Sequence, residues 1–188
     1  NDFIREKSPK LAIGAEYSYN VGASNMVGEG HNDFQMYDKE GAADYPDYRK
    51  LSADLLFKWN GFSLLAEYVN ATANGLNGLY VEKDEGAKLK PRQIANYLAL
   101  GNGLNVQAGY LFRKLWALDV AYSKVNPEWK ETGQSVLREA DNITFGASKY
   151  FNNNTFKLQL AGSYTSYNQL VGAGSKEFQV KLNLHILF

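Results

Sequence analysis

The sequence predicts an all-β fold: a transmembrane antiparallel β-barrel, to which this chain contributes eight strands. Three observations support this prediction. Large apolar residues recur at every second position in eight segments, the connections between segments are alternately long and short, and aromatic residues gather beside the short ones. Because successive side chains of a strand point to opposite faces, each segment has one apolar face and one mostly polar face.

The first seven segments follow this rule in chain order, after a polar lead-in at 1–9. The residues that mark their apolar faces are Leu11, Ile13 and Tyr17; Leu51, Leu55 and Phe57; Phe62, Leu64 and Tyr68; Leu104, Val106 and Tyr110; Trp116, Leu118 and Val120; Ile143 and Phe145; and Leu158, Leu160 and Tyr164. Asn60-Gly61 separates the second and third segments, and this pair is a strong hairpin signal because both residues accept a positive φ.

The last segment, 177–188, shows the alternation most clearly. It reads E-F-Q-V-K-L-N-L-H-I-L-F, with a large apolar residue at every second position from Phe178 to Phe188. A membrane strand needs such a continuous apolar face because lipid covers it over its whole length. This comb of residues resembles the terminal signal of outer-membrane barrels, so the barrel-assembly machinery is an expected partner.

The connections differ in length in a regular way. Long loops are predicted at about 21–47, 70–102 and 125–137, a short strand or helix at 94–100, and short turns near 60–61, 113–115 and 152–154. All the short turns therefore fall at one end of a single domain, 1–188. Outer-membrane barrels have short periplasmic turns and longer outer loops, so the pattern predicts the bacterial outer membrane as the location.

Side-chain volume indicates which face points outward. The interior of an eight-stranded barrel is just wide enough for side chains to fill, and the large apolar residues exceed that space. The polar face, rich in Gly, Ala and Ser, suits a lumen. A two-sheet sandwich that buries the apolar face is the alternative. The predicted lumen-facing residues are Glu16, Asp54, Lys58, Glu67, Asp119, Lys157, Lys181 and His185.

Aromatic residues flank the predicted short turns and form an expected interfacial girdle. These residues are Trp59, Phe62, Phe112, Trp116, Phe151, Phe156 and Phe188. The girdle predicts outer-membrane lipid as the partner of the apolar face.

Composition and motifs argue against other classes of function. The 20 Lys and Arg balance the 20 Asp and Glu, there is no Cys, and neither His31 nor His185 has a partner at ligand spacing. We therefore predict no enzyme activity, no cofactor and no nucleic-acid partner. The acidic residues of 31–47 lack the spacing of a calcium loop, which favours a solvated loop over a cation site.

One pair of carboxylates is predicted to lie close together. A two-residue turn at Asn60-Gly61 places Asp54 directly opposite Glu67 on the polar face. Two carboxylates at that separation repel, and Lys58 or water is the expected neutralising neighbour.

Four stretches of the chain, 9–20, 54–68, 103–110 and 156–164, resemble the phosphate-selective porin O/P family. The resemblance implies a trimeric outer-membrane pore of about sixteen strands that passes phosphate or other anions. This chain is similar to the carboxy-terminal half of such a barrel. No residue matches a phosphate-binding motif.

Two functions remain open at this stage. The first is an outer-membrane porin that passes small hydrophilic solutes, with anions such as phosphate implied by the resemblance. The second is a closed eight-stranded barrel with a plugged lumen, which would act structurally or through its loops. The closed strand number separates them, because eight strands leave no aqueous channel and about sixteen do.

Overall fold

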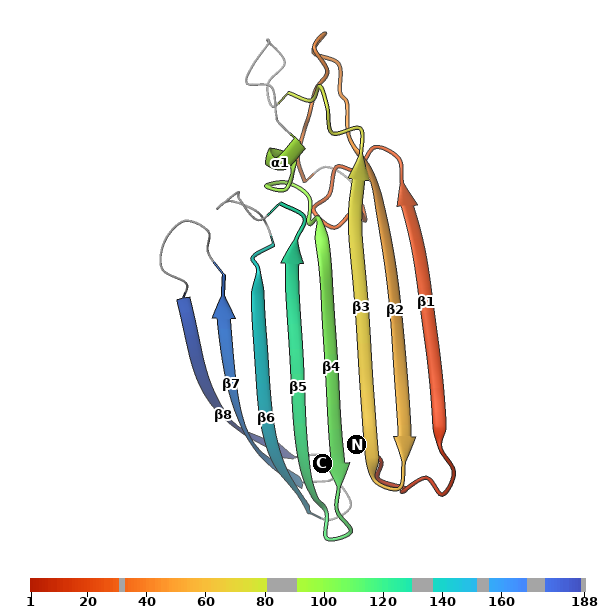
Figure 1. Cartoon of the computed structure of the whole chain (residues 1–188), viewed down its shortest axis with the longest axis vertical. Helices are drawn as coiled ribbons and strands as arrows, with labels where there is room; N and C mark the ends of the chain where they lie inside the picture. The colour runs from red at the N-terminus through yellow and green to blue at the C-terminus, as the bar shows by residue number, and fades with distance from the viewer. Residues whose placement is uncertain (31–32, 81–90, 130–136, 152–155, 169–174, 187–188) are drawn as a thin grey trace.

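Eight antiparallel strands form one sheet in the order β1-β2-β3-β4-β5-β6-β7-β8 in the computed structural model (Figure 1). The structure describes residues 1–30, 33–80, 91–129, 137–151, 156–168 and 175–186. The strands are β1 Lys10–Asn20, β2 Asp47–Trp59, β3 Phe62–Asn74, β4 Gly101–Leu111, β5 Trp116–Pro127, β6 Ala140–Phe151, β7 Phe156–Tyr167 and β8 Ser175–Ile186. The predicted all-β fold with eight strands is confirmed.

The sheet is open. Each strand pairs only with its neighbours in the chain, so β1 and β8 are edge strands. Every described residue of β8 is exposed, on both faces. The sheet is not closed, so the predicted barrel is not confirmed.

The predicted short turns lie where the sequence places them, as far as the structure describes them. Trp59 pairs with Phe62, and Asn60 and Gly61 have φ values of 49° and 91°. In the second turn, Leu115 has a φ of 58° and its backbone N–H donates to the Phe112 carbonyl at 2.9 Å. The turn predicted at 152–154 lies outside the described residues.

Several strands are longer than predicted at the long-loop end. β2 begins at Asp47, β3 continues to Asn74, and β5 continues to Pro127. The expected loop boundary at 47 agrees with the start of β2 to within one residue, whereas those at 70 and 125 were wrong by a few residues. These extensions lack large apolar residues at every second position, so the alternation gives no sign of them, although the backbone pairing continues.

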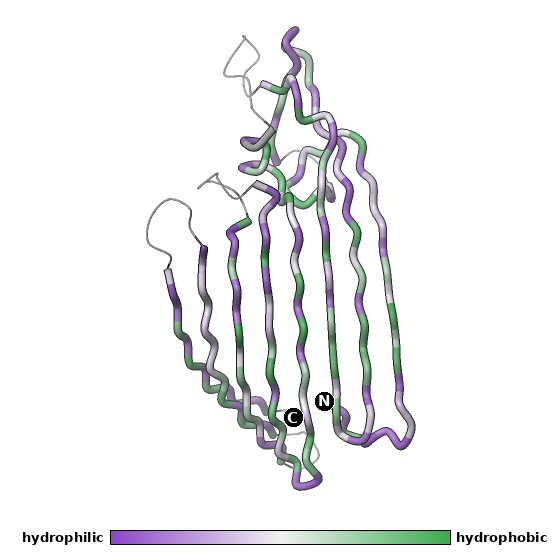
Figure 2. The backbone as a smooth tube through the Cα atoms, viewed as in Figure 1, coloured by the Kyte–Doolittle hydropathy of each residue, from purple (hydrophilic) through white to green (hydrophobic). Residues whose placement is uncertain are grey.

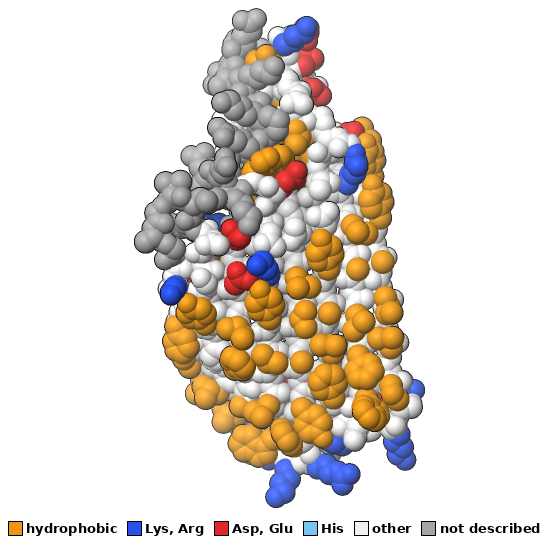
Figure 3. All heavy atoms as spheres, in the orientation of Figure 1, with side chains coloured by type: hydrophobic (Ala, Val, Ile, Leu, Met, Phe, Trp, Pro, Cys, Tyr) orange, Lys and Arg blue, Asp and Glu red, His pale blue; other side chains and the backbone are white. Residues whose placement is uncertain are grey.

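The sheet curves, and its two faces differ in chemistry. Along the strands, hydrophobic residues alternate with hydrophilic ones (Figure 2). The face in view in Figure 3 is covered with hydrophobic side chains, and β7 and β8 bend away behind it (Figure 1). The polar face is concave and encloses a cavity of about 670 Å³ lined by residues of β2 to β7.

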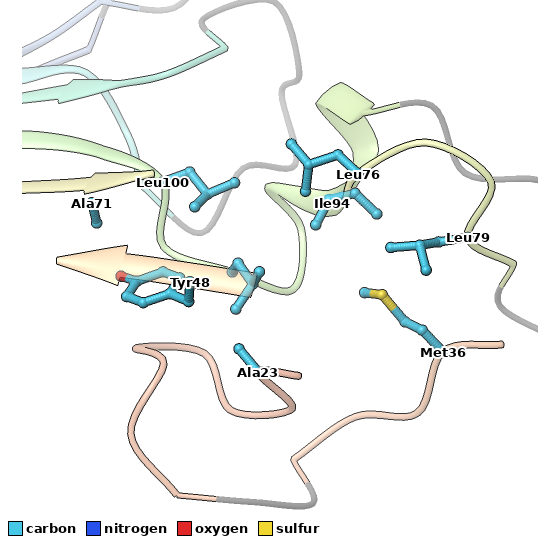
Figure 4. Close-up of a cluster of buried hydrophobic side chains, with 9 residues drawn as sticks. Ala23, Met36, Tyr48, Ala71, Leu76, Leu79, Ile94 and Leu100 are labelled. Atoms are coloured by element: carbon cyan, nitrogen blue, oxygen red, sulfur yellow. The ribbon is translucent and has the colours of Figure 1, made fainter. Parts of the chain in front are cut away.

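A hydrophobic core lies at the long-loop end, mostly in the long loops and partly on the ends of β2 and β3 (Figure 4). It contains Ala23, Met36, Tyr48, Ala71, Leu76, Leu79, Ile94, Leu98 and Leu100. The segment predicted as a short strand or helix at 94–100 includes the end of a single helical turn, α1 (Pro91–Ile94). A two-hydrogen-bond bridge between Tyr37 and Tyr80 joins the first loop to the second.

The sequence analysis predicted two long loops here but not that they share a core. Their apolar residues are spaced irregularly, and neither the period of a strand nor that of a helix reveals that they pack together. We call this group the loop core.

The loop core leads to a testable prediction. Leu98 is fully buried, and Leu98→Ala should destabilise the loops by about 2–5 kcal/mol because it leaves a cavity. Trp129 packs against the core and reports on it. Urea titration of its fluorescence, with Trp59 and Trp116 replaced by Phe, should show the loss. Val27→Ala, at an exposed position, is the control, and equal midpoints for the two variants would contradict the loop core.

Candidate functional site

The cavity on the concave face is the candidate site. Its polar lining includes Gln107, Asp119, Asn142, Thr144, Lys157 and Gln159. These side chains come from β4, β5, β6 and β7, and they share one face because the strands pair in register with the same alternation. Small residues such as Gly109, Ala121, Gly146 and Ala161 leave the space between them.

The structure places all eight predicted lumen-facing residues on this concave face. Lys58, Asp119 and Lys157 line the cavity itself. Asp54 and Glu67 lie on the same face of β2 and β3. Glu16, Lys181 and His185 belong to the edge strands β1 and β8, where they are exposed.

The Asp119 side chain occupies space that is open only because residue 109 is a glycine. A Cβ atom at position 109 would collide with the Asp119 carboxylate and would lie 3.0 Å from Asn1 Oδ1. Gly109 and Asp119 are paired residues of β4 and β5. Because Gly109 has no side chain, the Asp119 carboxylate fits beside it.

The lead-in packs against the sheet, which the sequence did not indicate. Asn1 lines the cavity and donates from Nδ2 to the Tyr150 hydroxyl at 2.9 Å. Asp2 is buried and accepts hydrogen bonds from the backbone N–H groups of Gly61 and Glu6. The segment thus lies at the short-turn end of the concave face. Its polar composition resembled that of a solvated tail.

The predicted pairing of Asp54 with Glu67 is confirmed by the register of β2 and β3. A neutral side chain contacts one of the two carboxylates. Asn105 Nδ2 donates to Glu67 Oε2 at 2.7 Å, and Asn105 Oδ1 accepts from Ser123 Oγ at 3.0 Å. Lys58 forms no ion pair with either carboxylate within the described part of the chain. The amide stabilises the Glu67 carboxylate by a hydrogen bond and adds no positive charge.

At the other end, the first loop bends inward over the concave face. Asn20 Nδ2 donates to the Gly28 carbonyl at 2.8 Å, and Lys50 forms an ion pair with Glu29. Gly28 lies directly against the Tyr48 ring. The strand residues that these loop residues contact, Asn20, Tyr48 and Lys50, all belong to the concave face. The first loop therefore covers the long-loop end of that face.

The acidic residues of the first loop serve the loop's own structure. Asp38 Oδ1 accepts from the backbone N–H groups of Glu40 and Ala42, and Asp33 accepts from Asn25 Nδ2. No group of three or more His, Asp or Glu in the described residues could hold a metal ion. His31 lies outside them.

The predicted girdle residues gather at the short-turn end of the convex face. Phe151 and Phe156 have ring centroids 4.9 Å apart, and Lys149 Nζ lies 5.1 Å from the Trp116 centroid. Trp59 is about half exposed, beside Phe62 across the hairpin. Phe112 follows β4, and Phe188 lies outside the described residues. Among the residues that the structure describes, no helix has the length and hydropathy needed to cross a membrane.

Comparison with protein-family models, with curated proteins and with solved structures found no significant match. The resemblance to the phosphate-selective porins, which rests on short stretches of strand, stays a prediction.

The inward-bent loop leads to a second prediction. Gly28→Ala should destabilise the first loop by about 1–3 kcal/mol more than Gly78→Ala, because the added methyl group meets the Tyr48 ring. Gly78 is the matched control: it has a positive φ as well, but nothing lies within 4 Å of an added Cβ. The rate of limited proteolysis within 21–46 measures the difference. Equal rates would contradict the contact.

Proposed function

We propose that this chain forms part of the wall of an outer-membrane porin, through which small hydrophilic solutes pass along its concave face. The observation that carries the proposal is the contrast between the two faces of the curved sheet. The convex face is apolar and bare, and the concave face is polar and encloses a cavity.

The convex face is unsuited to water. Residues from all eight strands leave large apolar side chains exposed on it, including Ile13 at 71%, Leu118 at 56% and Leu182 at 70%. Soluble monomers rarely expose a continuous apolar patch larger than a few hundred Å². Contact with lipid would remove the free-energy cost of exposing this apolar surface to water. The hydrogen bonds between neighbouring strands already satisfy the backbone groups that would find no partner in a bilayer.

Aromatic rows on the convex face support a bilayer position. Near the long loops, one cross-strand row contains three aromatic residues and one aliphatic residue: Tyr122, Ile143, Tyr164 and Phe178. Near the short turns, Phe151 pairs with Phe156. Phe156 and Tyr164 are eight residues apart (164 − 156), or about 27 Å along β7. With a tilt of about 40°, this becomes roughly 20 Å, close to the ~25 Å apolar band of membrane barrels.

The open edges favour a larger barrel over a closed one of eight strands. A membrane sheet cannot leave its edge N–H and C=O groups in lipid, so β1 and β8 need further strands beside them. In the structure they do not pair with each other. No observation therefore favours the plugged eight-stranded alternative. The resemblance implies about sixteen strands in the complete wall.

The remaining parts of the proposal rest on the sequence and on the resemblance. The apolar comb on β8 fits recognition by the barrel-assembly machinery of the bacterial outer membrane. Anion passage and a trimeric assembly are implied by the resemblance alone. Lys58 and Lys157 in the cavity are compatible with anions, but Asp119 lies beside them.

The membrane position can be tested by charge insertion. Leu55→Arg and Leu182→Arg should each cost about 2–4 kcal/mol near the bilayer centre, because the convex face would carry a charge into lipid. Ser52→Arg, on the concave face of β2, should cost much less. Refolding titrations in lipid vesicles measure all three. Equal tolerance would overturn the assignment of the faces.

The passage of solutes can be tested by conductance. The intact protein should give stable channels in planar bilayers, and Lys157→Glu with Lys181→Glu should shift the reversal potential towards cation selectivity. Two cations of the concave face become anions, which favours entry of cations. The control, Lys39→Glu with Arg138→Glu, makes the same charge change at the long-loop end and should shift the reversal potential less. A folded protein without channels would defeat the porin proposal.

A further inference from the structure

A second pocket lies on the other side of the wall, at the short-turn end. It has a volume of about 500 Å³ and is lined by Arg5, Tyr110, Phe112, Arg113, Lys114 and Trp116. Three of these six side chains are cationic and three are aromatic. Tyr110 and Trp116 belong to the convex face, and the pocket therefore adjoins the girdle and not the cavity.

Arg5 brings a charge from the lead-in to this pocket. Its guanidinium donates to the Leu111 carbonyl at 2.5 Å and to the Tyr110 hydroxyl at 3.0 Å, and it lies 5.6 Å from the Tyr110 ring centroid. The Asn60 carbonyl and Oδ1 are its other acceptors. All four acceptors are uncharged oxygens, so these hydrogen bonds fix the position of the guanidinium and leave its charge in place.

The turn between β4 and β5 supplies two more charges. Arg113 and Lys114 are exposed, and within the described part of the chain neither side chain has a hydrogen-bond or ion-pair partner. Lys149 adds a fourth cation beside the pocket: its Nζ donates to the Lys114 carbonyl at 2.7 Å and lies over the Trp116 ring. Figure 3 shows Lys and Arg side chains along the lower rim, directly below the apolar field.

We propose that this pocket binds the phosphate group of an anionic phospholipid in the leaflet at the short-turn end. The proposal rests on the proposed membrane position. Headgroups lie where the apolar band of a membrane protein ends, and juxtamembrane Lys and Arg attract anionic lipids. Arg binds phosphate through paired N–H donors, which suits Arg113, while Arg5, whose two Nη groups already donate to protein oxygens, contributes its positive charge.

The aromatic half of the lining favours a lipid over a free phosphate ion. An inorganic ion offers nothing to the ring faces of Tyr110, Phe112 and Trp116. Aromatic rings at a membrane interface lie at the level of the headgroups, next to the glycerol and the first methylenes of the acyl chains. A phospholipid presents phosphate and apolar chain together, in the same order as the cations and rings of the pocket.

The test uses Trp116 as the reporter in the intact protein, with Trp59 and Trp129 replaced by Phe. The protein is inserted into vesicles that contain equal fractions of either brominated phosphatidylglycerol or brominated phosphatidylcholine, and quenching gives the relative affinity for the two lipids at Trp116. Arg113→Gln with Lys114→Gln is the test variant. Arg138→Gln with Lys176→Gln makes the same change in net charge at the long-loop end and is the matched control.

The expected result is a preference for phosphatidylglycerol in the parent protein and in the control, lowered at least fivefold in the test variant, since each cation near the lipid surface contributes about a fivefold factor. The proposal would be overturned if the relative affinity for the two lipids were equal in all three proteins, or if the parent protein preferred neither lipid. Loss of the preference on adding millimolar inorganic phosphate at constant ionic strength would assign the pocket to a free anion and overturn it as well.

The same measurement separates this inference from the proposed function. Quenching by both lipids without preference means that the chain is embedded but that the pocket selects no headgroup. No quenching by either lipid means that Trp116 does not face a bilayer. The proposed function then fails, and the lipid site fails with it.

Discussion

The ladders of backbone hydrogen bonds between neighbouring strands hold this molecule together. Few described strand residues with apolar side chains are buried, namely Tyr48, Ala71, Leu111, Ala117, Pro127 and Tyr150. A soluble sheet of this size would gain most of its stability from apolar burial on one face, about 25 cal/mol for each Å². Here the apolar face is exposed, and the seven ladders of backbone hydrogen bonds hold the strands together. In our proposal, lipid covers the apolar face.

This arrangement places the only sizeable packed core of the described residues at one end. The loop core joins the first and second long loops through buried residues such as Met36, Leu79 and Leu98. Unlike the strands, these loops bury their apolar side chains as a soluble protein does. The molecule thus combines two kinds of structure: strands that depend on their surroundings and a loop assembly that carries its own core.

Much of the sheet could be predicted from the sequence because each strand repeats with a period of two. The hairpin at Asn60-Gly61 and the opposition of Asp54 and Glu67 follow from that period and from local turn chemistry. Long-range packing could not be predicted. Tyr48 and Gly28 are ordinary residues in the sequence, and only the folded loop brings them together. The polar lead-in likewise gave no sign that Asp2 would be buried, since its partner, Gly61, is distant in the sequence.

The lead-in has a consequence for the order of folding. Every ladder joins strands that are neighbours in the chain, so hairpins can add one after another, each closing only the connection between two consecutive strands. The hydrogen bond between Asn1 and Tyr150 is different, because it joins residues 149 positions apart and needs β6 in place. Asn1 can reach this position only after most of the sheet exists. The docked first residue therefore marks a late stage of assembly.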